Sequence, residues 1–287
     1  MAGRRKSGEI LDVNFNGAFA YHIVLENSFD ALSGYLEEAG CCGRRVCIVS
    51  DTNVAPLYLD EVKEIAASCA GVVETYVFPA GEASKTLDTV RDLYQFLIGK
   101  GFDRHDLLLA LGGGVTGDIT GFAAATYLRG IRFIQVSTTL LSQVDSSIGG
   151  KTGVDFDSYK NMVGAFHMPA LVYINTAVLE TLPDEQFASG MGEVLKSGLI
   201  RDADFYEWTI NHMSEIEEKD ARTMLSSTGK PFQSGQAMLW PTGSTRRTSS
   251  VPMILQGNWR TMRIFLQRPY SGWLRMQIWQ GSLERMI

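Results

Sequence analysis

Three glycines near the middle of the chain have the spacing of a dinucleotide-binding loop. Gly112, Gly114 and Gly117 form a G-x-G-x-x-G string that follows the apolar run 107–111 and precedes an expected helix. Glycines let the backbone approach a pyrophosphate, and the N-terminus of a helix supplies N–H donors and a positive dipole. The string therefore predicts a dinucleotide site. A tight strand-to-helix turn without a ligand is the alternative.

The usual acidic partner of such a loop, which binds the ribose about 20 residues further on, is missing. Residues 137–139 are Ser, Thr and Thr. Asp51 ends an earlier apolar run and can take the ribose role instead. The order of the elements thus departs from the common dinucleotide-binding fingerprint.

A second glycine string, GGKT at 149–152, stands among side chains that bind anions. A Walker A loop is excluded, because that motif requires glycine where Asp145 stands. Lys151, Lys160 and Asn161 lie close together in the sequence. This density of cationic and amide groups beside glycine predicts a phosphate or polyol site, with a solvated loop as the alternative.

Glu193 and Lys196 share one face of an expected helix, because they are three residues apart. Gly190, Gly192 and Gly198 flank them, and each glycine costs a helix about 1 kcal/mol relative to alanine. Such costs indicate a close approach to another group. A carboxylate metal ligand and a surface Glu–Lys pair both fit this spacing.

Alternating strands and helices must position these groups. Apolar runs predict strands at 46–50, 75–78, 107–111, 131–136 and 171–174, with helices at 84–100, capped by Ser84, and at 118–128. This alternation indicates a parallel α/β sheet. After Pro183 the pattern is only helical, over 184–200 and from 203 to about 225. We expect an α/β domain followed by the start of a helical one.

The composition places the chain among globular proteins. Apolar residues make up 45% of its 287 positions and charged residues 20%, which excludes a wholly disordered chain. No run of 18 apolar residues predicts a membrane helix, and the first residues lack the apolar region of a secretory signal. The four cysteines lack zinc-ribbon spacing, so we expect reduced thiols and a cytoplasmic location. The net charge of −6 argues against nucleic-acid binding.

The last 66 residues differ sharply in charge from the rest. Residues 222–287 hold one acid and nine bases, a net of +8, whereas residues 1–221 hold 31 acids and 17 bases, a net of −14. The segment also has four of the five tryptophans and no lasting helical or strand period. We interpret it as an aberrant basic tail, frameshifted or poorly ordered. A basic arm for an anionic partner is the alternative.

Several long strings together resemble the 3-dehydroquinate synthase family of sugar-phosphate cyclases, over about residues 20–221. They are FPAGEASK at 78–85, LGGGVTGD at 111–118, YLRGIRFIQVSTTLLSQVDSSIGGKTGVD at 127–155, KNMVG at 160–164 and SGMGEVLK at 189–196. GGKT distinguishes this family from related cyclases that make inosose or valiolone. It also argues against an alcohol dehydrogenase of the same fold.

The resemblance implies a fold, a reaction and cofactors. It implies an NAD-binding Rossmann-like domain at 1–181 and a helical metal and substrate domain that begins at 182–221. The family converts 3-deoxy-D-arabino-heptulosonate 7-phosphate to 3-dehydroquinate and phosphate in the shikimate pathway. NAD⁺ takes a hydride and returns it, and zinc, or cobalt in its place, holds the substrate hydroxyls. A homodimer without nucleic-acid or membrane partners is implied as well.

The resemblance also implies roles for individual residues. The expected NAD contacts are Asp51, Glu82, Lys85, Gly113, Gly114, Val115, Asp118, Thr138, Thr139, Lys160 and Thr181. The expected catalytic and substrate-binding residues are Arg129, Asp145, Lys151, Asn161 and Lys196, with Lys160 also reaching the substrate. Glu193 corresponds to the first zinc ligand.

The resemblance ends near residue 221. The family takes two further zinc ligands from histidines in its C-terminal domain, one of them in an Asn-Phe-Gly-His-Thr string. The four histidines of this chain are His22, His105, His167 and His212, and that string is absent. Catalytic zinc usually takes three protein ligands, and Glu193 is the one ligand that can be assigned here. We therefore expect impaired activity. We also expect the helix at 184–200 to expose the apolar face that its partner helices would cover. An inactive NAD-binding pseudoenzyme is the alternative function.

Overall fold

The computed structural model describes residues 8–15, 17–220, 223, 224, 226, 228, 263–267 and 275–279. The chain divides into two compact units, Met1–Leu239 and Trp240–Ile287. In the second unit, the described residues form an antiparallel pair, β10 (Arg263–Gln267) and β11 (Arg275–Trp279). Most of the segment interpreted as an aberrant tail lies outside the described residues, so that interpretation stays a prediction.

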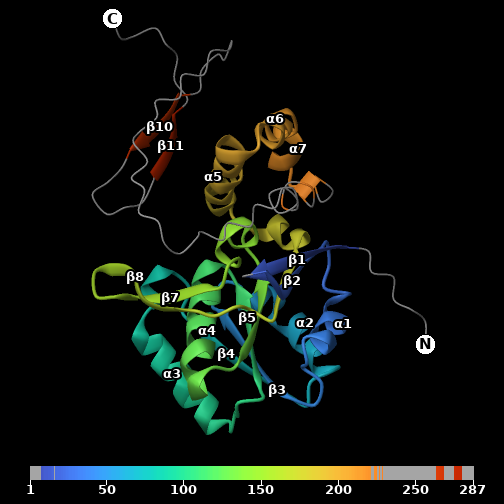
Figure 1. The fold of residues 1–287 in the computed structure, drawn as a ribbon, viewed down its shortest axis with the longest axis vertical. Helices are drawn as coiled ribbons and strands as arrows, with labels where there is room; N and C mark the ends of the chain where they lie inside the picture. The colour runs from blue at the N-terminus through green and yellow to red at the C-terminus, as the bar shows by residue number, and fades with distance from the viewer. Residues whose placement is uncertain are drawn as a thin grey trace, which may run out of the picture. The chain divides into compact units, whose positions relative to one another are not determined.

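The first unit is built on a seven-stranded sheet, drawn in Figure 1. Its strands, in their order across the sheet, are β1 (Glu9–Phe15), β2 (Ala18–Glu26), β9 (Leu171–Asn175), β6 (Arg132–Ser137), β5 (Leu107–Gly112), β3 (Arg45–Asp51) and β4 (Val72–Phe78). All neighbours pair in parallel except the β1–β2 hairpin. The predicted parallel α/β sheet is thereby confirmed.

Helices cover both faces of this sheet. α1 (Leu32–Glu38) and α2 (Ala55–Ala67) pack on one face, and α3 (Leu87–Gly99) and α4 (Gly114–Thr126) pack on the other. All six residues of β5 are buried, because helices cover this central strand on both sides. Strands buried on both faces have continuous apolar sequences, which explains the run at 107–111.

Two predicted helix starts are wrong. α3 begins after Thr86, which has an extended backbone (φ −130°, ψ 162°) and accepts a hydrogen bond from the Thr89 N–H at 3.2 Å. Ser84 instead ends a 3₁₀ turn, Glu82–Ser84. α4 begins at Gly114, four residues before the predicted start, because the glycine loop itself enters the helix.

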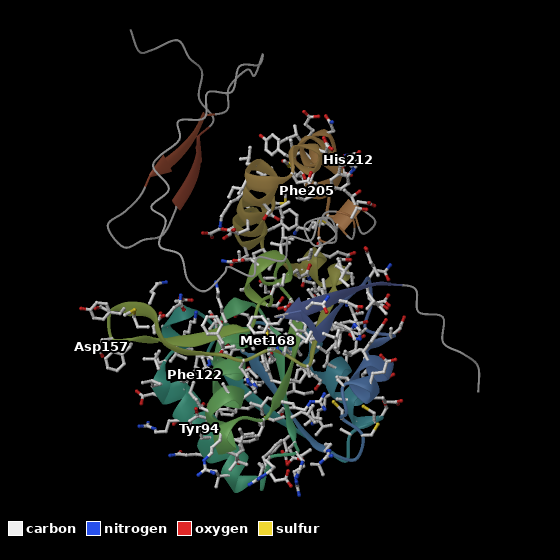
Figure 2. All side chains as sticks on the ribbon, in the orientation of Figure 1. Tyr94, Phe122, Asp157, Met168, Phe205 and His212 are labelled. Carbon is white, nitrogen blue, oxygen red and sulfur yellow. The ribbon has the colours of Figure 1, made fainter. Side chains whose placement is uncertain are left out.

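A hairpin that the sequence did not predict packs against α4. It consists of β7 (Lys151–Phe156) and β8 (Tyr159–Phe166), which pair antiparallel. Its turn is at Asp157, labelled in Figure 2, where φ is 52°. Gly121 of α4 permits the contact: a Cβ there would lie 2.3 Å from the Thr152 methyl carbon.

The helical part follows the sheet. α5 (Asp184–Arg201) is continuous, but the helix predicted from 203 to about 225 is broken at His212 into α6 (Ala203–Asn211) and α7 (Met213–Glu217). The apolar face of α5 is covered, contrary to expectation. Phe187, Met191 and Val194 are buried in a cluster with Phe205 of α6 and Leu140 of the sheet domain.

Four short turns join the main elements. They are η1 (Glu82–Ser84), η2 (Tyr127–Arg129), η3 (Ser142–Ser146) and η4 (Thr176–Thr181). Within the described ranges, no helix is long and apolar enough to cross a membrane.

Candidate cofactor and substrate site

The glycine loop lies where the order of the parallel strands reverses. From β3 the chain goes to β4 on one side and then to β5 on the other side of β3. Ser50 of β3 is paired with Leu111 of β5, so Asp51 and Gly112 leave adjacent strands at the carboxyl edge. In open α/β sheets, ligands bind in the crevice at such a reversal.

The loop backbone is closely packed by its neighbours. A Cβ on Gly113 would lie 2.9 Å from the Thr139 methyl carbon, and a Cβ on Gly114 would lie 2.9 Å from Ser146 Oγ. Alanine at either position would therefore force its neighbour to move. The glycines leave the first N–H groups of α4 uncovered by side chains of their own, as an anion site at a helix N-terminus requires.

Two hydroxyl groups beside this loop are buried without a hydrogen-bond partner among the described residues. They are Thr138 Oγ1, directly after β6, and Ser146 Oγ, which faces Gly114. A buried hydroxyl without a partner costs about 1–3 kcal/mol. Polar atoms of a bound cofactor would remove this cost.

Asp51 is held in place by three donors. Its Oδ2 accepts from the Thr116 hydroxyl of α4 at 3.0 Å, and its Oδ1 accepts from the N–H groups of Asn53 and Val54 at 2.9 and 3.1 Å. An ionised carboxylate has about four acceptor positions. One position is left for a ribose hydroxyl.

Lys85 joins the cofactor side of the site to the hairpin. Its side chain is buried, and its Nζ lies 2.5 Å from Asp118 Oδ2 and donates to Asn161 Oδ1 at 2.5 Å. Burial raises the pKa of Asp118 to about 6, and the Lys85 ammonium opposes this shift. The expected cofactor residues Lys85 and Asp118 and the expected substrate residue Asn161 thus form one network.

Two further contacts fix the hairpin to the loop before α3. Lys160 Nζ lies 3.0 Å from Glu82 Oε1, and the Asp155 N–H donates to the Lys85 carbonyl at 2.8 Å. The Asp155 carboxylate then accepts from the Asn161 N–H at 2.7 Å. That bond stabilises Asn161 in a left-handed conformation, φ 55°. Sequence reasoning assigned no role to Asp155, whose contribution depends on tertiary pairing.

Four charged side chains form a cluster that involves η3 and α5. Lys196 Nζ lies 2.7 Å from Glu193 Oε2 on α5. Asp145 of η3 is partly withdrawn from water by the surrounding protein, which raises its pKa. Glu193 raises this pKa further, whereas the ammonium groups of Lys196 and Lys151 lower it. The structure therefore brings these four predicted residues within electrostatic reach of each other.

Arg129, the remaining expected substrate residue, does not lie in this charged cluster. It is exposed in η2, beyond the C-terminal end of α4, whereas Gly114 is at the N-terminal end. A 13-residue helix is about 20 Å long, so Arg129 of this chain lies at the opposite edge of the sheet from the glycine loop.

Thr181 and Val115 are the remaining expected cofactor contacts. Thr181 ends η4, and its hydroxyl is hydrogen-bonded to the Tyr58 hydroxyl of α2. Val115 lies in the first turn of α4 and packs partly against the core under α3. Neither contact excludes a role at the cofactor.

The two cofactors fit these residues differently. The glycine loop, the buried hydroxyls and Asp51 supply the donors and acceptor that a dinucleotide requires. For a metal, Glu193 is the one assigned ligand, and it is already paired with Lys196. No group of three His, Cys, Asp or Glu side chains in the described part of the chain could hold a metal ion. These residues alone do not fit a catalytic zinc site.

Comparison with known proteins shows what this chain is similar to. Residues 75–189 match the family described as 3-dehydroquinate synthase N-terminal. This region is similar to the N-terminal part of 3-dehydroquinate synthases. A 3-dehydroquinate synthase of Acetivibrio thermocellus is 45% identical over 210 residues, which are 73% of this chain and 58% of that protein. The chain thus spans little more than half of this relative.

Solved structures of sugar-phosphate cyclases share the fold. One is a 2-deoxy-scyllo-inosose synthase solved with carbaglucose-6-phosphate, NAD⁺ and Co²⁺. It is 30% identical to this chain with a TM-score of 0.61, and the matched region covers 68% of this chain and 52% of the synthase chain. Another is the 2-epi-5-epi-valiolone synthase of Streptomyces hygroscopicus subsp. jinggangensis 5008, solved with NAD⁺ and Zn²⁺. It is 28% identical to this chain with a TM-score of 0.64, and the matched region covers 79% of this chain and 65% of the synthase chain. The predicted Rossmann-like fold class is confirmed.

Proposed function

We propose that this chain carries the NAD⁺ site and part of the substrate site of a 3-dehydroquinate synthase. The reaction would convert 3-deoxy-D-arabino-heptulosonate 7-phosphate to 3-dehydroquinate and phosphate. The observation that carries the proposal is the network that the buried Lys85 forms with Asp118 and Asn161, because it joins the expected cofactor residues to the expected substrate residues. A homodimer and a cytoplasmic location are part of the proposal and rest on the family alone.

The cofactor residues would hold NAD⁺ across the strand reversal. The pyrophosphate would lie against Gly113, Gly114 and the first N–H groups of α4. The buried Thr138 hydroxyl would find its missing partner there, and Asp51 would accept from a ribose hydroxyl. When bound, NAD⁺ accepts a hydride from the substrate and returns it, so that no net oxidation occurs.

The substrate residues would bind a phosphorylated polyol beside the cofactor. Lys151, Lys196 and the Asn161 amide are the cationic and donor groups that such a molecule needs. Asn161 Oδ1 already accepts a hydrogen bond from Lys85 Nζ. The Nδ2 group of Asn161 is therefore left to donate to a substrate hydroxyl. Asp145 has a raised pKa and lies near Lys196, so it can hold a proton in this region.

The proposal includes impaired turnover by this chain. Zinc polarises substrate hydroxyls in the family, and the described residues supply Glu193 as the one assigned ligand. The alternative function is an NAD-binding protein without turnover. Both alternatives predict NAD⁺ binding, and neither predicts phosphate release by this chain above that of a Glu193→Gln variant.

Phosphate release tests whether turnover by this chain is impaired. The 287-residue protein is incubated with the heptulosonate phosphate, NAD⁺ and ZnSO₄, and inorganic phosphate is measured. We expect no release above that of a Glu193→Gln variant. Release that depends on NAD⁺ and is lost in Glu193→Gln would contradict impairment and support a complete synthase site. Failure of the protein to bind NAD⁺ would refute both functions.

A further inference from the structure

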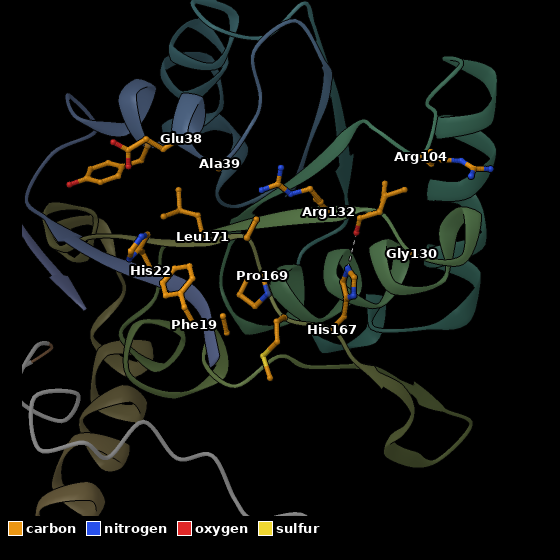
Figure 3. A pocket seen from close by; sticks show the side chains of 15 residues that line it. Phe19, His22, Glu38, Ala39, Arg104, Gly130, Arg132, His167, Pro169 and Leu171 are labelled. Carbon is orange, nitrogen blue, oxygen red and sulfur yellow. Dashed lines mark hydrogen bonds between the residues drawn. The ribbon is translucent and has the colours of Figure 1, made fainter. Parts of the chain in front are cut away.

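A cavity of about 550 Å³ lies at the opposite edge of the sheet from the glycine loop. Figure 3 shows it at the amino ends of the central strands, where β6 begins at Arg132 and β9 begins at Leu171. Small-molecule sites typically measure about 300–1,000 Å³. None of the residues expected to bind NAD or substrate lines this cavity.

Part of its inner wall is apolar. Ala39, Ile131, Pro169 and Leu171 line the cavity and are buried. At the rim, the Phe19 ring is 56% exposed and packs against the His22 imidazole at 4.6 Å between ring centres. This wall and the Phe19 ring offer apolar contacts to a small apolar or aromatic body.

Two guanidinium groups line the same cavity. Arg132 and Arg104 are exposed, and neither guanidinium group forms a hydrogen bond or an ion pair with a described residue. Gly40 leaves room for Arg132: φ there is +85°, and a Cβ would lie 2.6 Å from Arg132 Nη1. The missing side chain at Gly40 therefore leaves space for this guanidinium at the cavity wall.

The two histidines of the wall already have partners. His22 Nδ1 lies 2.8 Å from Asp12 Oδ1, and His167 Nε2 lies 2.7 Å from the Ile131 carbonyl oxygen, the contact drawn in Figure 3. Among the described residues that line the wall, Glu38 is the one carboxylate, and it also has an interaction of its own. The charges available to a ligand are thus the two arginines, in a chain whose net charge is −6.

We propose that this cavity is a second ligand site, which binds a small organic anion. The carboxylate or phosphate of the ligand pairs with Arg132, which offers planar, bidentate donors. Arg104 supplies a second positive charge, and the apolar body lies against Pro169 and Leu171. This site is independent of the proposed NAD⁺ site, because the two lie at opposite edges of the sheet.

The test uses three probes on the full 287-residue protein. Benzoate presents a carboxylate on an apolar ring, benzyl alcohol lacks the charge, and inorganic phosphate lacks the apolar body. Binding is measured by ligand-observed NMR at constant ionic strength. We expect benzoate to bind at millimolar concentration and at least about tenfold more tightly than either other probe, as one charge-assisted hydrogen-bonded pair provides.

Variants locate the binding. Arg132→Gln should weaken benzoate at least about tenfold, whereas Arg91→Gln should leave it unchanged, because Arg91 is an exposed arginine of α3 outside the cavity. Arg104→Gln provides a second test if Arg132→Gln does not fold. Saturating NAD⁺ should not displace benzoate.

Three results would overturn the proposal. One is no benzoate binding to the unmodified protein. The second is equal binding of benzyl alcohol or phosphate. The third is displacement of benzoate by NAD⁺, which would place it in the cofactor site. Loss of NAD⁺ binding with benzoate binding intact would refute the proposed function alone.

Discussion

Replacing Lys85 by methionine should make the stability of this protein strongly dependent on pH. Lys85 Nζ lies 2.5 Å from Asp118 Oδ2, and their side chains are 6% and 20% exposed. Lys85→Met keeps the length of the side chain but removes the charge that opposes the desolvation of Asp118. The Asp118 carboxylate would then be buried without its cation.

The size of the effect follows from the two protonation states. Burial raises the pKa of Asp118 from 3.8 to about 6 even with Lys85 present. Because this folded-state pKa is above the unfolded value, protonation stabilises the fold, and the free energy of unfolding rises as pH falls through 6 towards 4. At pH 8 the variant leaves an ionised carboxylate unpaired, which costs about 3–5 kcal/mol. At pH 5 the carboxyl group is protonated, so a cost of about 1–2 kcal/mol for lost hydrogen bonds remains.

Urea unfolding at pH 8 and pH 5, followed by circular dichroism, measures the difference. We expect Lys85→Met to lose at least about 2 kcal/mol more at pH 8 than at pH 5. Asp118→Asn in the same protein should remove most of this pH dependence. The matched control is Arg91→Met, because Arg91 is 64% exposed and pairs with an exposed Asp88; it should change stability by less than about 0.5 kcal/mol at both pH values.

An equal loss at both pH values would refute the reasoning. It would mean that Asp118 is not a buried carboxylate that depends on Lys85. A pH dependence of stability that persists in the double variant, Lys85→Met with Asp118→Asn, would assign the effect to another group.

Three further predictions concern the packing and charges of the first unit. Gly121→Ala should lower the free energy of unfolding by about 1–3 kcal/mol, because the new Cβ would lie 2.3 Å from the Thr152 methyl carbon; a stabilised variant in urea unfolding would contradict this contact. Thr86→Val should cost about 1 kcal/mol, since the hydroxyl caps α3; an unchanged melting midpoint would argue against the cap. Glu193→Gln should lower the pKa of Asp145, because the Glu193 charge raises it; a carbon-13 NMR titration of the Asp145 carboxyl checks the direction.

The sequence predicted the central part of the sheet and its glycine loop because their signals are local. Residues 107–111 are apolar without interruption, since β5 is buried on both faces. Gly112–Gly114 follow directly, so a strand, a loop and a helix could be inferred from one short window. The strand reversal that makes this loop a site depends on the order of strands, which no local window contains.

The β7–β8 hairpin shows what the sequence could not supply. Its residues are largely polar or glycine, and β8 is mostly exposed, so neither strand has a clear apolar alternation. The hairpin is held by contacts with distant segments, through Gly121 of α4 and through Lys85. The network of Lys85, Asp118 and Asn161 has the same origin, because its members are 33 and 43 residues apart in sequence.

The break at His212 was also hidden. Apolar residues continue at helical spacing on both sides of it, and periodicity does not report a change of axis. In the structure, the His212 ring stacks on Trp208 at 4.4 Å between ring centres, and its Nδ1 lies 2.8 Å from the Trp208 carbonyl oxygen. A side chain bound to the last carbonyl groups of a helix favours its end there.

The affinity of the glycine loop for NAD⁺ tests the central claim most directly. Isothermal titration calorimetry with the 287-residue protein should show one NAD⁺ per chain. Gly114→Ala should weaken binding at least about tenfold, because a Cβ there would lie 2.9 Å from Ser146 Oγ and would force this neighbour of the loop to move. Gly99→Ala, where a Cβ at the end of α3 meets no atom within 4 Å, should bind as the parent does. A folded protein that gives no heat with millimolar NAD⁺, or equal affinities in the two variants, would contradict the account.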